Sequence, residues 1–299
     1  MKWPLKSKPV ANRKTPFFNL LYLSAAGQGG PDSSIVWTSE LEWQPIQDHI
    51  SKFNQTNSRL VSSIHLLAQA VGHALAQHPE INRRVVGRRV YEFENCNVCI
   101  AMRVPRNQEI NVVQIKQADQ KSLHQIGHTV WEKQMEFMHN SSGESRDFKR
   151  IRRMPTRLVR MAIRTISFLD SCFRLPVFGR IDRLRESVVL INDFSNSRFP
   201  VMRGYKPSRQ PGESKPLSVT LGRPEEKVEL VDGKPVAKLV APITVRVDHR
   251  ICDGFQLANF TGTIIDLLRA PQSMDAGSSG EETGTAKTNE PIKLYRKSA

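Results

Sequence analysis

The sequence has little cysteine and no long hydrophobic run. Only 4 of its 299 residues are cysteine, too few for the disulfide framework of a small secreted protein. No run approaches the roughly 18 consecutive apolar residues of a membrane-spanning helix. The basic start at Met1 also lacks the apolar core and cleavage site of a secretory signal. We therefore expect a globular protein of the cytoplasm.

Acidic residues are scarce relative to basic ones. The chain has 29 aspartate and glutamate residues against 44 lysine and arginine residues, which gives a net charge of +15. Such an excess favours polyanionic partners: nucleic acid, anionic lipid, an acidic carrier protein or a phosphorylated cofactor. The sequence has no zinc-finger spacing and no RNA-binding aromatic motif, so nucleic acid is the least favoured of these. Cys96 and Cys99 form a lone Cys-x-x-Cys without a partner pair, and we expect no metal site.

The most informative stretch is residues 243–254. Apolar and polar side chains alternate over residues 243–248, the period-2 pattern of a half-buried strand. His249 continues the apolar side of this pattern, and Asp253 with Gly254 gives a turn signal four residues later. A helical apolar pattern follows to residue 268. A histidine at this place suits proton transfer near neutral pH, although a histidine satisfied in the core explains these residues equally well.

This stretch resembles a known catalytic signature. Residues 249–254, His-Arg-Ile-Cys-Asp-Gly, are similar to the His-x-x-x-Asp-Gly motif of the CoA-dependent acyltransferases. That superfamily includes chloramphenicol acetyltransferase and the catalytic domain of the dihydrolipoamide acyltransferases of 2-oxo-acid dehydrogenase complexes. The flanking Asp248 and Arg250 resemble the second group, and residues 251–255 resemble the first.

The resemblance continues in consistent order over about residues 13–270. The chain predicts strands at 17–23, 35–44, 187–193 and 217–222, a strand pair at 90–104, a hairpin at 227–240, and helices at 46–54, 61–77 and 123–138. The resemblance implies an α/β (α+β) fold of the chloramphenicol acetyltransferase type, a two-layer sandwich with a mixed β-sheet packed against helices. Residues 1–12 are expected to form an arm and residues 271–299 a disordered tail. We expect a free-standing catalytic domain without a lipoyl domain.

The resemblance also implies a mechanism. His249 would be the general base that deprotonates a thiol, hydroxyl or amine acceptor, which then attacks an acyl thioester without forming a covalent acyl-enzyme. Asp253 would hold the turn at Gly254. In this family an arginine just before the first strand pairs with the signature aspartate, and Arg13 is the best match to that arginine. An exposed Arg13 in a flexible arm is the alternative. Asn192 stands where the family has a serine that stabilises the oxyanion. An amide can also donate to an oxyanion.

Several partners and roles follow as expectations. Ser195 is a second candidate for the oxyanion donor. The family implies coenzyme A, or an acyl group on a carrier protein or lipoyl group, as donor, and a homotrimer with active sites between subunits.

Residues 148–168 predict a basic amphipathic helix, which would lie on an anionic membrane or an acidic partner, or in a bundle with a solvated basic face. The alternatives to an enzyme are a catalytically lapsed scaffold and a peripheral membrane protein acting through this helix.

Overall fold

The computed structural model describes residues 7–9, 34–58, 60–86, 89–103, 110–139, 187–198 and 215–275, together with five single residues between 155 and 165. Arg13, the expected strand 17–23 and nearly all of the expected basic helix 148–168 lie outside the described residues.

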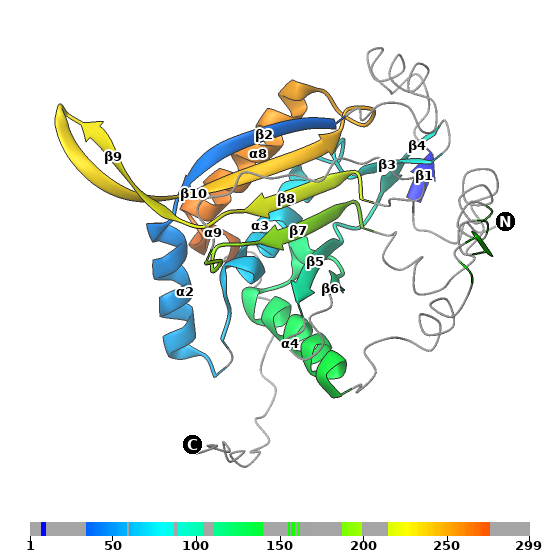
Figure 1. Cartoon of the computed structure of the whole chain (residues 1–299), viewed down its shortest axis with the longest axis horizontal. Coiled ribbons are helices and arrows are strands. Elements are labelled where there is room, and N and C mark those ends of the chain that lie inside the picture. The colour runs from blue at the N-terminus through cyan, green and yellow to red at the C-terminus, as the bar shows by residue number, and fades with distance from the viewer. Residues whose placement is uncertain are drawn as a thin grey trace.

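A mixed sheet of seven strands forms the centre of the molecule (Figure 1). Its order is β2 (Ser34–Glu42), β10 (Lys234–Asp248), β8 (Leu217–Leu221), β7 (Val189–Asp193), β5 (Val98–Arg103) and β6 (Ile110–Ile115), and β9 (Glu225–Val231) pairs with the first half of β10. Strand β7 runs parallel to β5 and β8, and the other pairs are antiparallel. A second sheet joins β1 (Ser7–Pro9), β4 (Arg89–Phe93) and β3 (Arg83–Val86).

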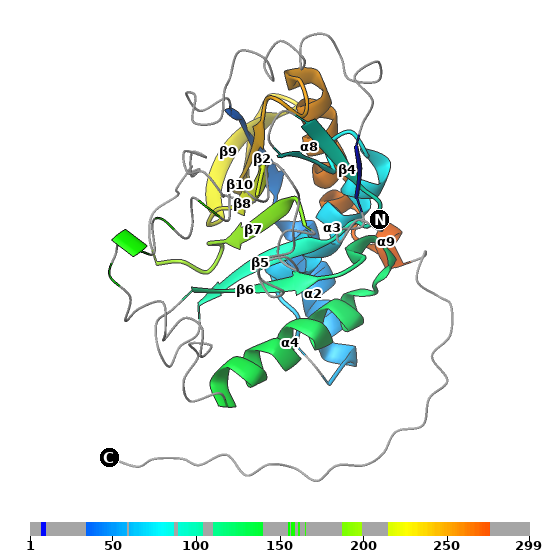
Figure 2. The same cartoon turned by 90° about the vertical axis from the view of Figure 1, so that its right-hand side faces the viewer.

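The long helices lie against one face of the seven-stranded sheet (Figure 2). They are α2 (Gln44–Thr56), α3 (Ser63–Gln77), α4 (Leu123–His139) and α8 (Gly254–Arg269), with the short helices η2 (Ala118–Gln120) and α9 (Gln272–Asp275). None of the described helices has the length and apolar composition needed to cross a bilayer. The expected mixed sheet packed against helices is confirmed.

The alternation along β10 decides which side chains enter the core. Ile243, Val245 and Val247 are fully buried on the face that carries α3 and α8, and Phe260 of α8 is fully buried in the same cluster. Burial of each such side chain stabilises the fold by about 1.5–3 kcal/mol. The same strand therefore anchors the core and leads the chain to His249.

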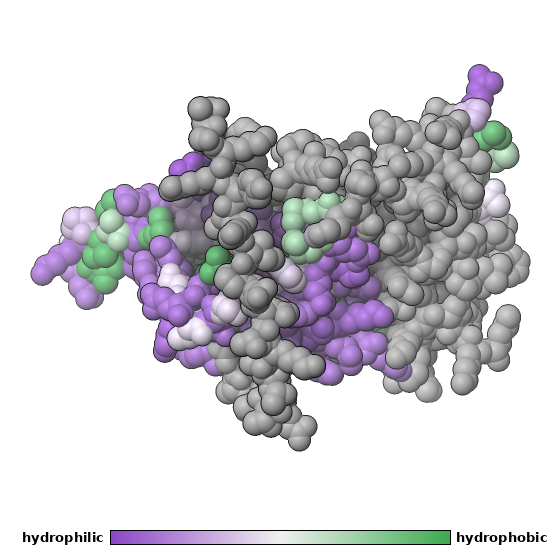
Figure 3. Space-filling model, turned by 90° about the horizontal axis from the view of Figure 1, so that it is seen from below, coloured by the Kyte–Doolittle hydropathy of each residue, from purple (hydrophilic) through white to green (hydrophobic). Residues whose placement is uncertain are grey.

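The first half of β10 belongs to a hairpin that protrudes from the body (Figure 1). Asp232 and Gly233 form its turn with φ of 51° and 76°, which the sequence Asp-Gly favours. The hairpin exposes large apolar side chains, with Val228 72% and Leu230 77% accessible. Figure 3 shows hydrophobic groups gathered at the protruding end of the molecule.

Three expectations need correction. The strands of the expected pair at 90–104 do not pair with each other, because β4 joins the small sheet and β5 the large one. Cys96 therefore precedes β5 and only Cys99 lies on it. Residues 272–275, which were assigned to the tail, form α9 instead, and Met274 is buried in the core. The strand β6 was not expected, because residues 113–123 were read as the segment that enters α4.

Candidate active site

The signature histidine lies just past the end of β10. The strand ends at Asp248, whose backbone N–H donates to the carbonyl of Pro216 at 2.9 Å, and the chain then turns through His249 and Arg250. The N–H of Ile251 donates back to the carbonyl of Asp248 at 3.0 Å and closes the turn. His249 is half-buried at the end of the sheet.

The ring of His249 is held in one tautomer. Its Nδ1 lies 2.8 Å from the carbonyl oxygen of Cys252. Because a carbonyl oxygen only accepts, Nδ1 must carry the proton and donate it. In the neutral imidazole Nε2 then carries the lone pair, the arrangement that a general base requires.

A charged pair clamps the residues on either side of this histidine. The guanidinium of Arg250 donates from Nε to both carboxylate oxygens of Asp248, at 2.9 and 3.0 Å, and from Nη2 at 2.5 Å. The backbone N–H of Arg250 also donates to the same carboxylate at 3.0 Å. Since both neighbours of His249 are fixed to each other, the backbone that carries the imidazole has little freedom.

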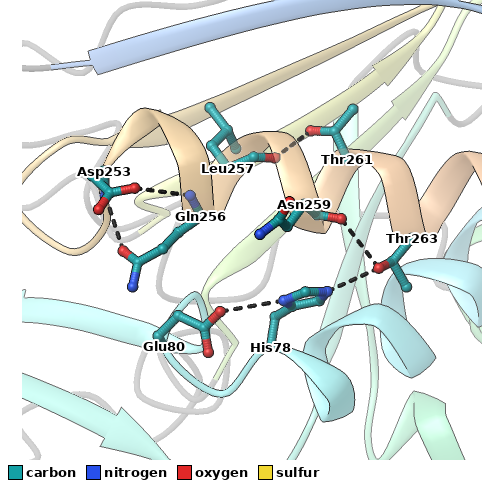
Figure 4. Close-up of polar contacts among 8 residues, drawn as sticks. All are labelled: His78, Glu80, Asp253, Gln256, Leu257, Asn259, Thr261 and Thr263. Atoms are coloured by element: carbon teal, nitrogen blue, oxygen red, sulfur yellow. Dashed lines mark hydrogen bonds and ion pairs between the residues drawn. The ribbon is translucent and has the colours of Figure 1, made fainter.

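Asp253 caps the helix that follows. Its carboxylate accepts from the backbone N–H of Gln256 at 2.8 Å, and the Gln256 side chain accepts from the N–H of Asp253 at 3.0 Å (Figure 4). This capping box satisfies two orphan donors at the start of α8. A Cβ at Gly254 would make only an ordinary contact with the Trp37 ring, at 3.8 Å. The carboxylate of Asp253 thus holds the turn, and its expected pairing with Arg13 falls outside the described residues.

A second polar chain supports α8 from behind, and sequence reasoning did not find it. His78, at the end of α3, lies 3.2 Å from Glu80 and 2.8 Å from the Thr263 hydroxyl of α8 (Figure 4). Its ring also packs edge-on against Phe260, with the centroids 6.0 Å apart. The segment after α3 is therefore tied to the helix that begins at the signature turn.

The two oxyanion candidates lie far from His249 within one chain. Asn192 on β7 is level with Thr220 on β8, which is level with Thr244 on β10. His249 follows Thr244 by five residues, so it lies roughly 16 Å further along the sheet at about 3.3 Å per residue. The arrows of β7 and β8 point away from the end of β10 in Figure 1. Asn192 and Ser195 therefore lie near one end of the sheet, and His249 lies at the opposite end of the sheet.

Ser195 belongs to a buried network at the end of β7. The Ser63 hydroxyl lies 2.5 Å from a carboxylate oxygen of Asp193 and 2.9 Å from the Ser195 hydroxyl. The other oxygen of Asp193 accepts from the backbone N–H of Ser195 at 2.8 Å. An ionised carboxylate only accepts hydrogen bonds, so the Ser63 hydroxyl donates its hydrogen bond to Asp193. The Ser195 hydroxyl must then donate to the Ser63 oxygen. The hydroxyl proton of Ser195 is therefore engaged in a hydrogen bond to Ser63 inside the protein.

Asn192 differs from Ser195 in this respect. It is half-buried on β7, and its side-chain amide makes no hydrogen bond within the part of the chain that the structure describes. The amide N–H groups are therefore available to an incoming oxyanion.

His65 lies beside this network on the first turn of α3. Its Nδ1 accepts from the backbone N–H of Ser62 at 2.9 Å, which completes a capping box. Burial lowers the pKa of His65, although the nearby charge of Asp193 acts in the opposite direction. The sequence pointed to Ser62 or Ser63 as the cap, but not to the link with Asp193, since a link over 130 residues leaves no local pattern.

Two of the described cysteines, Cys96 and Cys252, are unsuited to nucleophilic chemistry. Burial raises the pKa of the Cys96 thiol to about 12, and burial raises the pKa of the Cys252 thiol well above its ordinary range. Thiols of this kind stay protonated and inert, as we expected for Cys252. Within the described residues, no group of three or more histidine, cysteine, aspartate or glutamate side chains is arranged to hold a metal ion.

The comparisons with solved structures identify the fold. The dihydrolipoamide acetyltransferase of Azotobacter vinelandii matches with 15% identity and a TM-score of 0.56, over 86% of this chain and 87% of that chain. A truncated catalytic core of the 2-oxoacid dehydrogenase complex from Thermoplasma acidophilum matches with 16% identity and a TM-score of 0.55, over 88% and 99%. A chloramphenicol acetyltransferase matches with 13% identity and a TM-score of 0.54, over 88% and 99%.

The sequence itself identifies the family. No curated protein sequence gives a significant match. However, the family described as 2-oxoacid dehydrogenases acyltransferase (catalytic domain) matches residues 33–148 and 219–276, more than half of the chain and nearly all of the described core. The second matched range contains His249, Asp253 and Gly254. The chain therefore belongs to the family of 2-oxoacid dehydrogenase acyltransferase catalytic domains, and it has the chloramphenicol acetyltransferase-like fold.

Proposed function

We propose that the protein transfers an acyl group from a thioester to a thiol, hydroxyl or amine, with His249 as general base. The carrying observation is the 2.8 Å hydrogen bond from Nδ1 of His249 to Cys252, which makes Nε2 the basic nitrogen. Nε2 takes the acceptor's proton as the acceptor attacks the acyl carbonyl. The tetrahedral intermediate then expels the thiolate, which recovers the proton from the imidazolium. No covalent acyl-enzyme is needed, because base and both substrates meet at one place.

The amide of Asn192 is the proposed donor to the oxyanion of this intermediate. It is uncommitted, whereas the Ser195 proton is engaged with Ser63. The residues studied for their role in the mechanism of the Azotobacter vinelandii enzyme are a serine, a histidine and an asparagine four residues after that histidine. Here the residue four after His249 is Asp253, the cap of α8, so the same position would act through the turn and not on the reacting atoms.

The separation of these residues favours an active site made by two chains. Since His249 and Asn192 lie at opposite ends of the sheet, a site that contains both takes one from each of two neighbouring subunits. Head-to-tail contacts of this kind close into rings, and we propose a homotrimer. The apolar side chains on the β9–β10 hairpin support association, since exposed apolar groups of this kind mark interaction surfaces.

Coenzyme A is the proposed carrier of the acyl group, with an acyl carrier protein or a lipoyl group as the other candidate donors. The net charge of +15 supports either choice, because coenzyme A carries phosphates and carrier proteins are acidic.

The test is thiol release from a panel of acyl-CoAs and carrier-bound acyl groups with candidate acceptors. Wild type should show acceptor-dependent release, and His249→Ala should lose about 10²-fold or more, the scale of a missing general base. His128→Ala is the matched control, because His128 lies on α4 in an ion pair with Glu132. Release by neither donor class, or equal release by His249→Ala, contradicts the enzyme and favours a lapsed scaffold.

A further inference from the structure

Arg246 is a buried cation on the sheet face that turns away from the helices. It lies between Val245 and Val247, which point into the core, and it shares its face with Thr244 and Asp248. Only 2% of its surface is exposed. An arginine is charged at every physiological pH, so this position places a full positive charge inside the protein.

No carboxylate within the described residues neutralises this charge. Nη1 donates to the Ser34 hydroxyl at 2.9 Å and Nη2 to the carbonyl oxygen of Lys215 at 3.1 Å. Nε is buried without a hydrogen-bond partner. Asp248 is on the same face, but both of its carboxylate oxygens bond Arg250. A buried charge with only neutral acceptors is costly, and it creates a place where an anion is favoured.

Further buried positive charge belongs to Lys215, whose backbone carbonyl accepts from Arg246. Lys215 Nζ donates to the carbonyl of Ser187 at 2.5 Å. Burial lowers the pKa of Lys215, the charge of Arg84 lowers it further, and Cys99 acts in the opposite direction. Arg84 is itself buried, at 7% exposed. The buried cations Lys215 and Arg84 thus lie near each other, and Lys215 is joined to Arg246 through its backbone carbonyl.

This cationic group lies at the same end of the sheet as His249. Ser34, one acceptor of the guanidinium, is the register partner of Asp248. Lys215, which supplies the other acceptor, precedes Pro216, whose carbonyl bonds the N–H of Asp248. The side chain of Arg246 therefore runs along the strand toward the turn that carries His249.

We propose that Arg246 binds an oxyanion, a carboxylate or phosphate, carried by a substrate of the proposed acyl transfer. The oxyanion accepts from the unpartnered Nε and neutralises the guanidinium. The substrate class depends on the proposed function, whereas anion binding itself does not.

The test measures anion binding without any catalysis. The melting temperature of the full chain is compared in inorganic phosphate, succinate and chloride at equal ionic strength, because an anion that binds only the folded state stabilises it. Wild type should be stabilised by phosphate or succinate over chloride. Arg246→Gln should bind that anion on the order of 10- to 100-fold more weakly, as expected for lost hydrogen bonds to a charged group. Arg269→Gln removes a surface charge and should respond as wild type.

Two results would overturn the proposal. They are no preference of wild type for phosphate or succinate over chloride, and an equal anion response in Arg246→Gln, whatever its stability in chloride. If Arg246→Gln does not fold, Arg246→Lys replaces it, since lysine keeps the charge but cannot bond Ser34 and Lys215 together through a planar fork. Unchanged anion binding in Arg246→Lys then overturns it.

Thiol-release assays distinguish the two sources of the oxyanion. A defect of Arg246→Gln with succinyl-CoA but not with butyryl-CoA assigns the anion to the acyl chain. An equal rise of KM for both assigns it to the phosphates of coenzyme A. No defect with either would overturn the substrate assignment. Anion binding in a protein without transfer activity would contradict only the proposed function.

Discussion

The hydroxyl of Ser63 at the start of α3 lies 2.5 Å from the carboxylate of Asp193 at the end of β7. This contact joins a helix and a strand that are 130 residues apart in the chain. It fixes the direction of the neighbouring hydrogen bond, because Ser195 must donate to Ser63. The two oxyanion candidates therefore separate into a structural hydroxyl and an uncommitted amide.

This separation predicts opposite effects for two alanine variants. Asn192→Ala should lower kcat by about 10²–10³-fold, as for loss of an oxyanion donor, with little change in stability. Ser195→Ala leaves Ser63 with one fewer partner in a buried network and should cost about 1–3 kcal/mol of unfolding free energy, with kcat nearly unchanged. Urea unfolding and steady-state kinetics on both variants check this. The reverse pattern would assign the oxyanion to Ser195.

Subunit mixing tests whether the active site is shared. The His249→Ala and Asn192→Ala variants should each be nearly inactive. After the two chains are unfolded and refolded together, about one quarter of the interfaces in a random ring pair an intact His249 with an intact Asn192. The mixture should regain activity toward that fraction of wild type. Refolding each variant alone is the control, and a mixture no more active than its parts would place the site within one chain.

The cap of α8 predicts a measurable stability cost. Asp253→Ala removes the acceptor for the N–H of Gln256 and should destabilise the protein by about 0.5–2 kcal/mol. Asp253→Asn keeps an acceptor and should recover most of this loss, as measured by urea unfolding. If Asp253→Asn is as unstable as Asp253→Ala, the charge of Asp253 matters more than its cap, and a pairing with Arg13 gains support.

His65 predicts a pH dependence of stability. Its pKa is lowered in the folded protein, so above the unfolded value near 6.5 both states are neutral and His65 adds no pH dependence. As pH falls from about 6.5 through the lowered folded pKa, the unfolded state binds the proton first and stability is lost. His65→Gln keeps a Ser-x-x-Gln capping box but cannot titrate.

Unfolding experiments between about pH 7.5 and pH 5 should therefore give a shallower loss of stability for His65→Gln than for wild type. His73, whose pKa burial also lowers, is present in both proteins and cancels in the comparison. Parallel curves for the two proteins would contradict the assignment of this loss to His65.

Sequence patterns predicted the elements that carry local information. The alternation before His249 gave the core strand, the Asp-Gly pair at 232–233 gave the hairpin turn, and Ser62 gave the start of α3. The pairing of β4 could not be predicted, because strand partners are chosen by long-range packing. The bond from Ser63 to Asp193 was missed for the same reason, and so was the buried charge of Arg246, whose place in the alternation is that of a solvent-facing residue.

Strand β10 is a single run of 15 residues from the hairpin turn to Asp248. For protein engineering, the effect of an insertion therefore depends on where along this strand it is made. One residue inserted between the hairpin and His249 would move the imidazole by about 3.3 Å and exchange the core face with the outer face. An insertion at Gly233, where a Cβ would meet nothing within 4 Å, leaves that register untouched. The hairpin turn is therefore the place for an insertion that must keep the register of β10 and the position of His249 in its own chain.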